Sequence, residues 1–354
     1  MRLPKFILLI ALFLSYISYA KPPIRVYILA GQSNMSGTQN PLVNQLPANL
    51  ASIVPNVLIK VNSYDVNCNW GSLQPGLGAT AANFGPEITF GRDELNALQV
   101  SDSTYCGTKI AIIKFSFGGT TLNRDWRPPS SGDTIGWLYK GLINDINTGL
   151  ATLDSTYDAQ IMGMCWMQGE YDALVDTMAG DYQTNLSNFI HDIRTALNLP
   201  TMPFCIGMID SSTHWTYNAI VRQAEINVAK STQGVSIFDT HGLATDGSHY
   251  NTAGQIELGH FFSRYLDDAY TTCTICNENN TLIFPNPSNG SFSILYLGIP
   301  TDYKFSITDM KGAEVLSGQL YIGCEVDISL LSAGVYFISL TTNEGTVVKK
   351  VIKI

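Results

Sequence analysis

The chain has 354 residues, enough for two domains, and 45% of them are hydrophobic, so a sizeable core can form. Only 14% are charged, as is common in secreted proteins, and the formal net charge is −9. An acidic chain without a basic run lacks the electrostatic footprint of a protein that binds nucleic acid or anionic membranes.

The first twenty residues have the pattern of a secretory signal peptide. Arg2 and Lys5 give a positive start, residues 6–14 form an apolar run, and residues 18–20 (Ser-Tyr-Ala) place small side chains where signal peptidase cleaves. This apolar run is too short to cross a bilayer, and no other segment is long and apolar enough. We therefore expect cleavage after residue 20, no transmembrane anchor, and a secreted or outer-surface location.

The mature chain keeps seven cysteines, an odd number. Cys165 and Cys205 lie in apolar runs and are expected to be buried free thiols. Two pairings are open in an oxidising compartment, Cys68 with Cys106 and Cys273 with Cys276. The Cys-x-x-Cys of the second pairing has no partner motif and no histidine nearby, so we expect no metal there.

Residues 24–270 alternate strand-like and helix-like segments. The apolar runs of strand length are 25–30, 109–115, 159–167, 203–209 and 235–239. The segments with helical spacing are 86–98, 137–150, 181–197, 217–230 and a last one after Asn251. This alternation predicts a parallel sheet covered by helices on both faces, with ligand sites at the carboxyl ends of its strands.

The composition changes near residue 277, where a polar stretch leads into the turn formers of residues 284–290 (Phe-Pro-Asn-Pro-Ser-Asn-Gly). Apolar residues then alternate with a spacing of two, in the pairs Phe292/Ile294, Phe305/Ile307, Val326/Ile328 and Val335/Phe337. The alternation predicts a small all-β unit, a sandwich.

Ser33 is the first candidate for chemistry. It lies in Gly31-Gln-Ser-Asn-Met-Ser-Gly37, directly after the first predicted strand, where flanking glycines can present it on a tight turn. The segment lacks the Gly-x-Ser-x-Gly elbow that presents the serine of α/β hydrolases. Taken alone, it fits a simple turn equally well.

A second loop favours the catalytic interpretation. Asp246 and His249 lie three residues apart, after the strand at 235–239, so the carboxylate could meet imidazole Nδ1 and leave Nε2 to face Ser33. The order Ser, Asp, His fits an α/β hydrolase sheet. The other histidines are less suited: His191 and His260 lie in helical segments, His214 could line a pocket, and His241 has no acid three residues ahead.

Residues 30–35 (Ala-Gly-Gln-Ser-Asn-Met) resemble the first block of the SGNH hydrolases in their acetylesterase variant. That variant includes sialate O-acetylesterases and the acetylxylan esterases of carbohydrate esterase family six. Further stretches that match it are 84–87 (Phe-Gly-Pro-Glu), 114–120, 166–170 (Trp-Met-Gln-Gly-Glu), 246–249 and 254–259. The resemblance, which spans residues 24–270 in order, implies a flavodoxin-like three-layer α/β/α fold and an esterase that needs no cofactor.

The resemblance also implies roles for single residues. Ser33 would be the nucleophile, His249 the general base and then acid, and Asp246 the acid that orients it. The oxyanion hole would consist of the backbone N–H groups of Ser33 and Gly85 and the side-chain amide of Gln168, which stands where other SGNH enzymes carry Asn.

Several assignments near these residues stay open. Glu170 is a second candidate for the acid behind the histidine, or it could hold the serine loop by accepting hydrogen bonds. Relatives often read Glu-Ser-Asp where this chain has Glu-Tyr-Asp, so Tyr171 could narrow the acyl pocket or contact a sugar. Trp126 and Arg127 could stack on or hydrogen-bond a sugar, and Trp70, Trp137 and Trp215 are equally possible contacts.

The tail resembles the C-terminal sorting domain of the type IX secretion system of Bacteroidetes, on residues 284–290, 331–337 and 347–354. This implies export across the outer membrane and a secretion machinery as partner; an ordinary accessory or sugar-binding module is the alternative. The expected organisation is a signal peptide at 1–20, an esterase domain at 21–272, a linker at 273–282 and a sorting domain at 283–354.

Together these patterns predict a secreted serine esterase that removes O-acetyl groups from an unspecified carbohydrate through an acyl-enzyme. Two alternatives remain, a lipase or thioesterase on the same fold and a non-catalytic glycan-binding protein of the cell surface.

Overall fold

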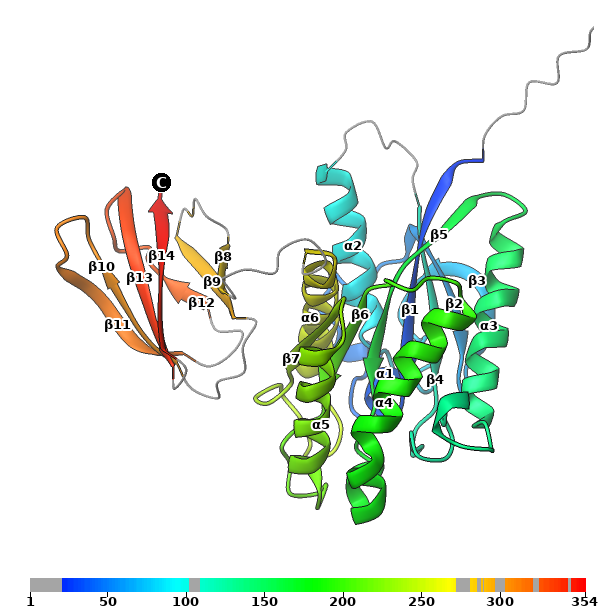
Figure 1. The fold of residues 1–354 in the computed structure, drawn as a ribbon. Coiled ribbons are helices and arrows are strands. Elements are labelled where there is room, and N and C mark those ends of the chain that lie inside the picture. Colours follow the sequence, from blue (N-terminus) through cyan, green and yellow to red (C-terminus); the bar gives the residue numbers. More distant parts are fainter. Residues whose placement is uncertain are drawn as a thin grey trace, which may run out of the picture.

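A computed structural model describes residues 21–101, 109–271, 281–284, 288, 290–296, 303–320, 325–342 and 345–354. These residues form an α/β unit and a smaller all-β unit (Figure 1). Each unit has its own hydrophobic core. The predicted signal peptide, Cys106, Cys273, Cys276 and most of the predicted linker lie outside the described residues.

The α/β unit is built on one seven-stranded sheet in the order β3-β2-β4-β1-β5-β6-β7. Its strands are β1 (Pro23–Gly31), β2 (Val54–Asn62), β3 (Asn67–Leu73), β4 (Lys109–Ser116), β5 (Asp158–Met167), β6 (Phe204–Met208) and β7 (Val235–Asp239). All neighbours run parallel except β2 and β3, which form an antiparallel hairpin at one edge. This hairpin was not predicted, because exposed residues alternate with half-buried ones along β3, which therefore lacks an apolar run.

Helices cover both faces of the sheet (Figure 1). They are α1 (Ser33–Ser36), α2 (Glu87–Ser101), α3 (Trp137–Leu153), α4 (Asp176–Ala196), α5 (Asn218–Ser231) and α6 (Thr252–Thr271), with short 3₁₀ turns at Val43–Gln45, Pro129–Ser131 and Asp172–Leu174. α2 and α6 pack against each other on one face, and α3, α4 and α5 cover the other. The predicted three-layer α/β/α fold with a parallel sheet is confirmed.

The core follows from this layering, since a parallel strand buried on both faces needs apolar side chains at nearly every position. β1 lies in the centre of the sheet, and its last six residues are buried. Cys165 and Cys205 are buried free thiols, as predicted, and they stand opposite each other on β5 and β6. Among the described helices, none is long and apolar enough to cross a membrane.

The all-β unit consists of two sheets that enclose a small apolar core. One has the order β11-β10-β13-β14 and the other β12-β9-β8. The strands are β8 (Thr281–Phe284), β9 (Ser291–Tyr296), β10 (Tyr303–Thr308), β11 (Glu314–Leu320), β12 (Glu325–Asp327), β13 (Gly334–Thr342) and β14 (Gly345–Lys353). All pairs between them are antiparallel, which confirms the predicted small β unit.

In one strand of this unit, the alternating apolar pair Val335/Phe337 is not the buried set. Tyr336, Ile338 and Leu340 of β13 point into the core, whereas Phe337 is 37% exposed. The run of apolar residues in β13 fits both faces, so its alternation could not fix the phase.

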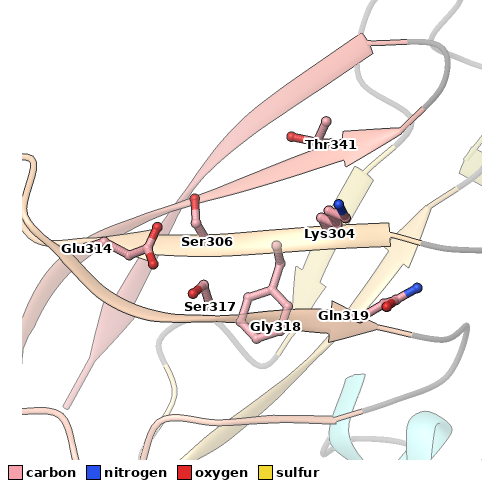
Figure 2. A pocket seen from close by; sticks show the side chains of 8 residues that line it. Lys304, Ser306, Glu314, Ser317, Gly318, Gln319 and Thr341 are labelled. Atoms are coloured by element: carbon pink, nitrogen blue, oxygen red, sulfur yellow. The ribbon is translucent and has the colours of Figure 1, made fainter.

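The four-stranded sheet carries an open hollow of about 420 Å³ on β10, β11 and β13. Figure 2 shows its polar lining, which includes Lys304, Ser306, Glu314, Ser317, Gln319 and Thr341. All of these residues lie in the tail, far along the chain from Ser33 and His249.

Candidate active site

Ser33 begins α1, directly beyond the end of the central strand. Gly31 has a φ of 152°, and a Cβ there would lie 2.0 Å from the carbonyl oxygen of Met167, so only glycine fits the turn. Gly37 ends α1 in the left-handed conformation, and its N–H donates to the Ser33 carbonyl at 3.0 Å. A Cβ on Gly37 would lie 2.0 Å from the carbonyl oxygen of Phe84. The two glycines thus fix the serine at the carboxyl edge of the sheet.

Asp246 holds the loop that carries His249. Its Oδ1 accepts the backbone N–H groups of Ser248 at 3.0 Å and His249 at 2.8 Å, and its own N–H donates to the His249 carbonyl at 3.0 Å. Burial lowers the pKa of His249, while the negative charge of Asp246 opposes this shift. The imidazole is therefore neutral at pH 7, the form that can accept a proton.

Asn34 joins the serine turn to the histidine loop. Its Nδ2 donates to the carbonyl oxygen of Ser248 at 3.4 Å, and its Oδ1 accepts the N–H of Tyr250 at 3.2 Å. The neighbour of Ser33 is thus bonded to both neighbours of His249. The segments that carry the two predicted catalytic residues, 216 positions apart in the sequence, are thus joined at one edge of the sheet.

The predicted contact between the Asp246 carboxylate and imidazole Nδ1 needs correction. Among the described residues, Nδ1 of His249 lies 3.0 Å from Oε1 of Gln39 and 3.3 Å from Oγ of Ser248. The Asp246 oxygens are used by the backbone of the loop and by the Asn40 side chain. Asp246 therefore acts on the histidine through the loop backbone and through its charge.

Glu170 is buried behind the serine turn. Its Oε1 accepts the Nδ2–H of Asn34 at 2.7 Å. Burial raises the pKa of Glu170 to about 7, and the hydrogen bond from Asn34 opposes this shift. Of the two roles left open for this carboxyl, the contact with Asn34 favours support of the serine turn.

Two of the predicted oxyanion donors are already used inside the protein. The Gly85 N–H donates to Oε1 of Glu87 at 2.9 Å. The Gln168 amide is fully buried and donates to Oδ2 of Asp172 at 2.7 Å and to the carbonyl oxygen of Thr120 at 3.0 Å. Because both amide hydrogens of Gln168 have acceptors, the structure does not supply the predicted hole from Gly85 and Gln168.

Gly118 is the residue that sequence reasoning missed. It follows β4, the neighbour of β1 in the sheet, and a Cβ there would lie 3.4 Å from Cβ of Ser33. Among the described residues, no acceptor takes its backbone N–H. Gly118 lies in residues 114–120, one of the stretches that carry the family resemblance, but its place beside the serine depends on a strand order that the sequence alone does not reveal.

The three predicted sugar-contact residues have different surroundings. Trp126 is completely buried among aromatic rings, and its Nε1–H donates to Oγ1 of Thr120 at 2.9 Å, so the prediction for Trp126 was wrong. Arg127 is half-buried and points toward Asn123, at 3.5 Å. Tyr171 is 43% exposed, and its ring lies beside Gly119.

A buried ion pair supports α1 from below. Nζ of Lys114 donates to Glu87 at 2.6 Å and to the carbonyl oxygens of Ser36 at 3.0 Å and Leu77 at 2.9 Å. Both charged side chains are fully buried. All three protons of the ammonium group have acceptors, which is the condition under which a buried charge is tolerated.

Acidic side chains also shape the loop beside the serine. Asp172 accepts the N–H groups of Leu122 at 2.8 Å and Asn123 at 3.0 Å, and burial raises its pKa to about 6.

No group of three or more His, Cys, Asp or Glu side chains within the described parts of the chain could hold a metal ion.

Comparison with known families agrees with this arrangement. The family model described as "Carbohydrate esterase, sialic acid-specific acetylesterase" matches residues 23–267. The chain belongs to this family. The family model described as "Secretion system C-terminal sorting domain" matches residues 282–354, so the tail belongs to a sorting-domain family and points to a secreted or cell-surface protein.

Relatives of the esterase family are distant in sequence. A probable carbohydrate esterase of Arabidopsis thaliana is 26% identical over 255 residues, which cover 67% of this chain and 88% of that protein. Its solved structure has a TM-score of 0.56 at 22% identity and covers 70% of this chain and 99% of its own.

Two further solved structures share the fold. NanS has a TM-score of 0.53 at 14% identity, covering 72% of this chain and 99% of its own. A carbohydrate acetylesterase from Xanthomonas citri has a TM-score of 0.50 at 15% identity, covering 92% of this chain and 78% of its own.

Proposed function

We propose that this protein is a secreted serine esterase that removes O-acetyl groups from carbohydrate, with Ser33 as nucleophile and His249 as base. The observation that carries the proposal is the pair of hydrogen bonds between Asn34 and the loop of His249, one donated by Asn34 and one accepted by it, which brings the two segments to the same edge of the sheet. Membership of a carbohydrate esterase family and the likeness to carbohydrate esterase folds support the substrate class.

The reaction proceeds in two steps. Nε2 of His249 takes the proton of the Ser33 hydroxyl as Oγ attacks the acetyl carbonyl carbon, and the resulting imidazolium gives that proton to the departing sugar oxygen. A water molecule, deprotonated by the same imidazole, then attacks the acetyl carbon of the acetyl-enzyme. The bond from that carbon to Oγ of Ser33 breaks, the imidazolium returns its proton to Oγ, and acetic acid leaves as acetate. The lowered pKa of His249 keeps it in the neutral form that the first step requires.

The oxyanion is held by backbone N–H groups. We assign the N–H of Ser33, at the start of α1, and the N–H of Gly118 to this role in place of Gly85 and Gln168. Each such donor typically contributes about a hundred- to a thousandfold in rate. Asp246 and Glu170 are positioning residues in this proposal: the first holds the histidine loop, and the second holds Asn34 beside the nucleophile.

The two ends of the chain serve export. In this proposal, residues 1–20 are a cleaved signal peptide, residues 21–272 are the esterase domain, and residues 283–354 are the sorting domain read by the secretion machinery after a linker at 273–282. The sorting-domain match over residues 282–354 supports the last assignment.

Replacement of the nucleophile tests the catalytic proposal. We expect Ser33→Ala to lower kcat for p-nitrophenyl acetate by about a thousandfold or more, since the acyl-enzyme can no longer form. Circular dichroism and the thermal unfolding midpoint of Ser33→Ala should match those of the unchanged protein. Full retention of activity by this folded variant would falsify the assignment.

The acyl group is tested with a series of p-nitrophenyl esters. An acetylesterase should lose activity as the chain grows from acetyl to octanoyl, whereas a lipase or thioesterase should gain it. Inertness toward a fluorophosphonate probe, combined with glycan binding, would instead identify a non-catalytic binding protein.

A further inference from the structure

Three exposed aromatic side chains lie at the edge of the sheet that carries Ser33. Tyr64 is 64% exposed, Trp137 is 52% exposed, and Tyr171 is 43% exposed. They come from three separate loops at the carboxyl edge: after β2, at the start of α3, and after β5. Within the described residues of the α/β unit, they are the large aromatic side chains that are exposed to this degree, while the other tryptophans are buried or half-buried.

Tyr64 and Trp137 are held by one buried ring. Phe117 is 7% exposed, and its ring centroid lies 5.0 Å from that of Tyr64 and 5.4 Å from that of Trp137, both in edge-to-face geometry. The Trp137 Nε1–H also donates to Oδ1 of Asp125 at 3.3 Å. A ring that is held at its edge and through its polar atom still leaves part of its face open to solvent. Because such a ring is already fixed, it loses less conformational entropy than a mobile side chain when a ligand binds to it.

The same Phe117 connects these rings to the reaction centre. Its backbone N–H donates to the carbonyl oxygen of Gly31 at 3.0 Å, two residues before the nucleophile. The next residue, Gly118, packs on Ser33. Tyr64 and Trp137 therefore occupy one flank of the nucleophile, and Tyr171, beside Gly119, lies near the same loop.

We propose that Tyr64 and Trp137 form a subsite for a sugar unit next to the one that carries the acetyl group, so that the substrate is an acetylated oligo- or polysaccharide and not an acetylated monosaccharide. This inference rests on the proposed esterase function. Pyranose rings have an apolar C–H face and polar hydroxyl edges. The C–H face can stack on a rigid aromatic ring while the hydroxyl groups stay in contact with water. A fatty acyl chain would require an enclosed aliphatic channel, whereas these rings stand open to solvent.

Polar groups at the rim fit the hydroxyl edges of a sugar. The side chain of Arg124 is 70% exposed, beside Asp125, which binds the Trp137 indole. The loop that carries these groups is rigid at its base, because Oδ2 of Asp125 accepts the N–H of Thr121 at 2.9 Å. The subsite thus combines two fixed rings with one exposed guanidinium group, which donates to Asp125 through Nε at 3.2 Å and Nη2 at 3.1 Å.

Chain-length kinetics test the subsite. We would measure kcat/KM for acetate release from partially acetylated xylan and mannan oligosaccharides of two to six units and from the matching acetylated monosaccharides, each divided by kcat/KM for p-nitrophenyl acetate. We expect at least one series to rise about tenfold from monosaccharide to oligosaccharide, and Tyr64→Ala and Trp137→Ala each to remove most of that rise.

A matched control and a separate readout make the result decisive. Ile220→Ala removes a similarly exposed apolar side chain on α5 and should leave the ratio unchanged. Trp137→Phe should keep part of the rise, which separates ring stacking from damage to the fold. Ratios independent of chain length in both series, or unaltered in Tyr64→Ala and Trp137→Ala, would overturn the subsite. The esterase proposal would still stand if Ser33→Ala were inactive toward p-nitrophenyl acetate.

Discussion

The edge around Ser33 and the hollow of the tail are both polar surfaces of a sheet. They differ in whether their ionisable side chains are buried. Under the serine, charged groups such as Glu170 and Lys114 are buried and hydrogen-bonded. In the hollow of Figure 2, Lys304 and Glu314 are exposed. Chemistry needs groups whose positions and pKa values the protein controls, and burial provides that control. The size of a hollow alone is therefore a poor guide to function.

The largest effect should come from breaking the buried pair under α1. Lys114→Met leaves the Glu87 carboxylate buried without its partner, and we expect a loss of about 3–5 kcal/mol in the free energy of unfolding. The double variant Lys114→Met/Glu87→Gln should recover part of that loss. All five tryptophans lie in the α/β unit, so the urea dependence of tryptophan fluorescence follows its unfolding alone.

Exposed charges of the hollow provide the contrast. Lys304→Met, in the tail, should change the free energy of unfolding by less than about 0.5 kcal/mol. An equal loss from Lys304→Met and Lys114→Met would show that burial does not distinguish the two regions.

An intermediate effect concerns the pH dependence of the histidine. The Asp246 charge raises the pKa of His249, so Asp246→Asn should lower that pKa and move the acid limb of kcat/KM to lower pH. Gln39→Glu places a new negative charge 3.0 Å from Nδ1 and should move the limb to higher pH. Rate profiles for p-nitrophenyl acetate between pH 4 and 8 measure both shifts. Shifts in the opposite directions would mean that another group controls the limb.

The smallest effect is expected in the hollow itself. Glu314→Ala and Gln319→Ala remove exposed side chains from the tail and should leave kcat and KM for p-nitrophenyl acetate within experimental error. A clear loss of activity in either variant would place part of the active site in the tail.

The sequence predicted those parts of the molecule that depend on local pattern. Long apolar runs identified five of the parallel strands, β1, β4, β5, β6 and β7, but not β2. Glycines on both sides of Ser33 identified its turn. The hairpin β2–β3 was missed because its outer strand is half solvated. The phase of β13 was missed because its apolar run suits both faces.

Assignments that depend on strand order could not be made in advance. Gly85 and Gly118 both lie in stretches that match the family. Only the position of β4 beside β1 brings Gly118 to the nucleophile. Trp126 lies near the same loop in sequence, yet it turns inward to pack on Trp166, while Trp137 stays outside. Which aromatic is buried is settled by packing across the sheet, and no local signal carries that information.

The central position of β1 has a consequence for how the chain reaches its native state. Both partners of this strand come much later in the sequence: Gly31 pairs with Ser116 on one side and with Met167 on the other. During synthesis, β1 can pair on one side once Ser116 has been made, about a third of the way along the chain, but its other side stays unpaired until Met167, near the middle of the chain, is available. Such long-range pairing slows folding and leaves an unpaired, aggregation-prone strand edge exposed. We expect this interval, before β5 has formed, to be when the protein most needs a chaperone.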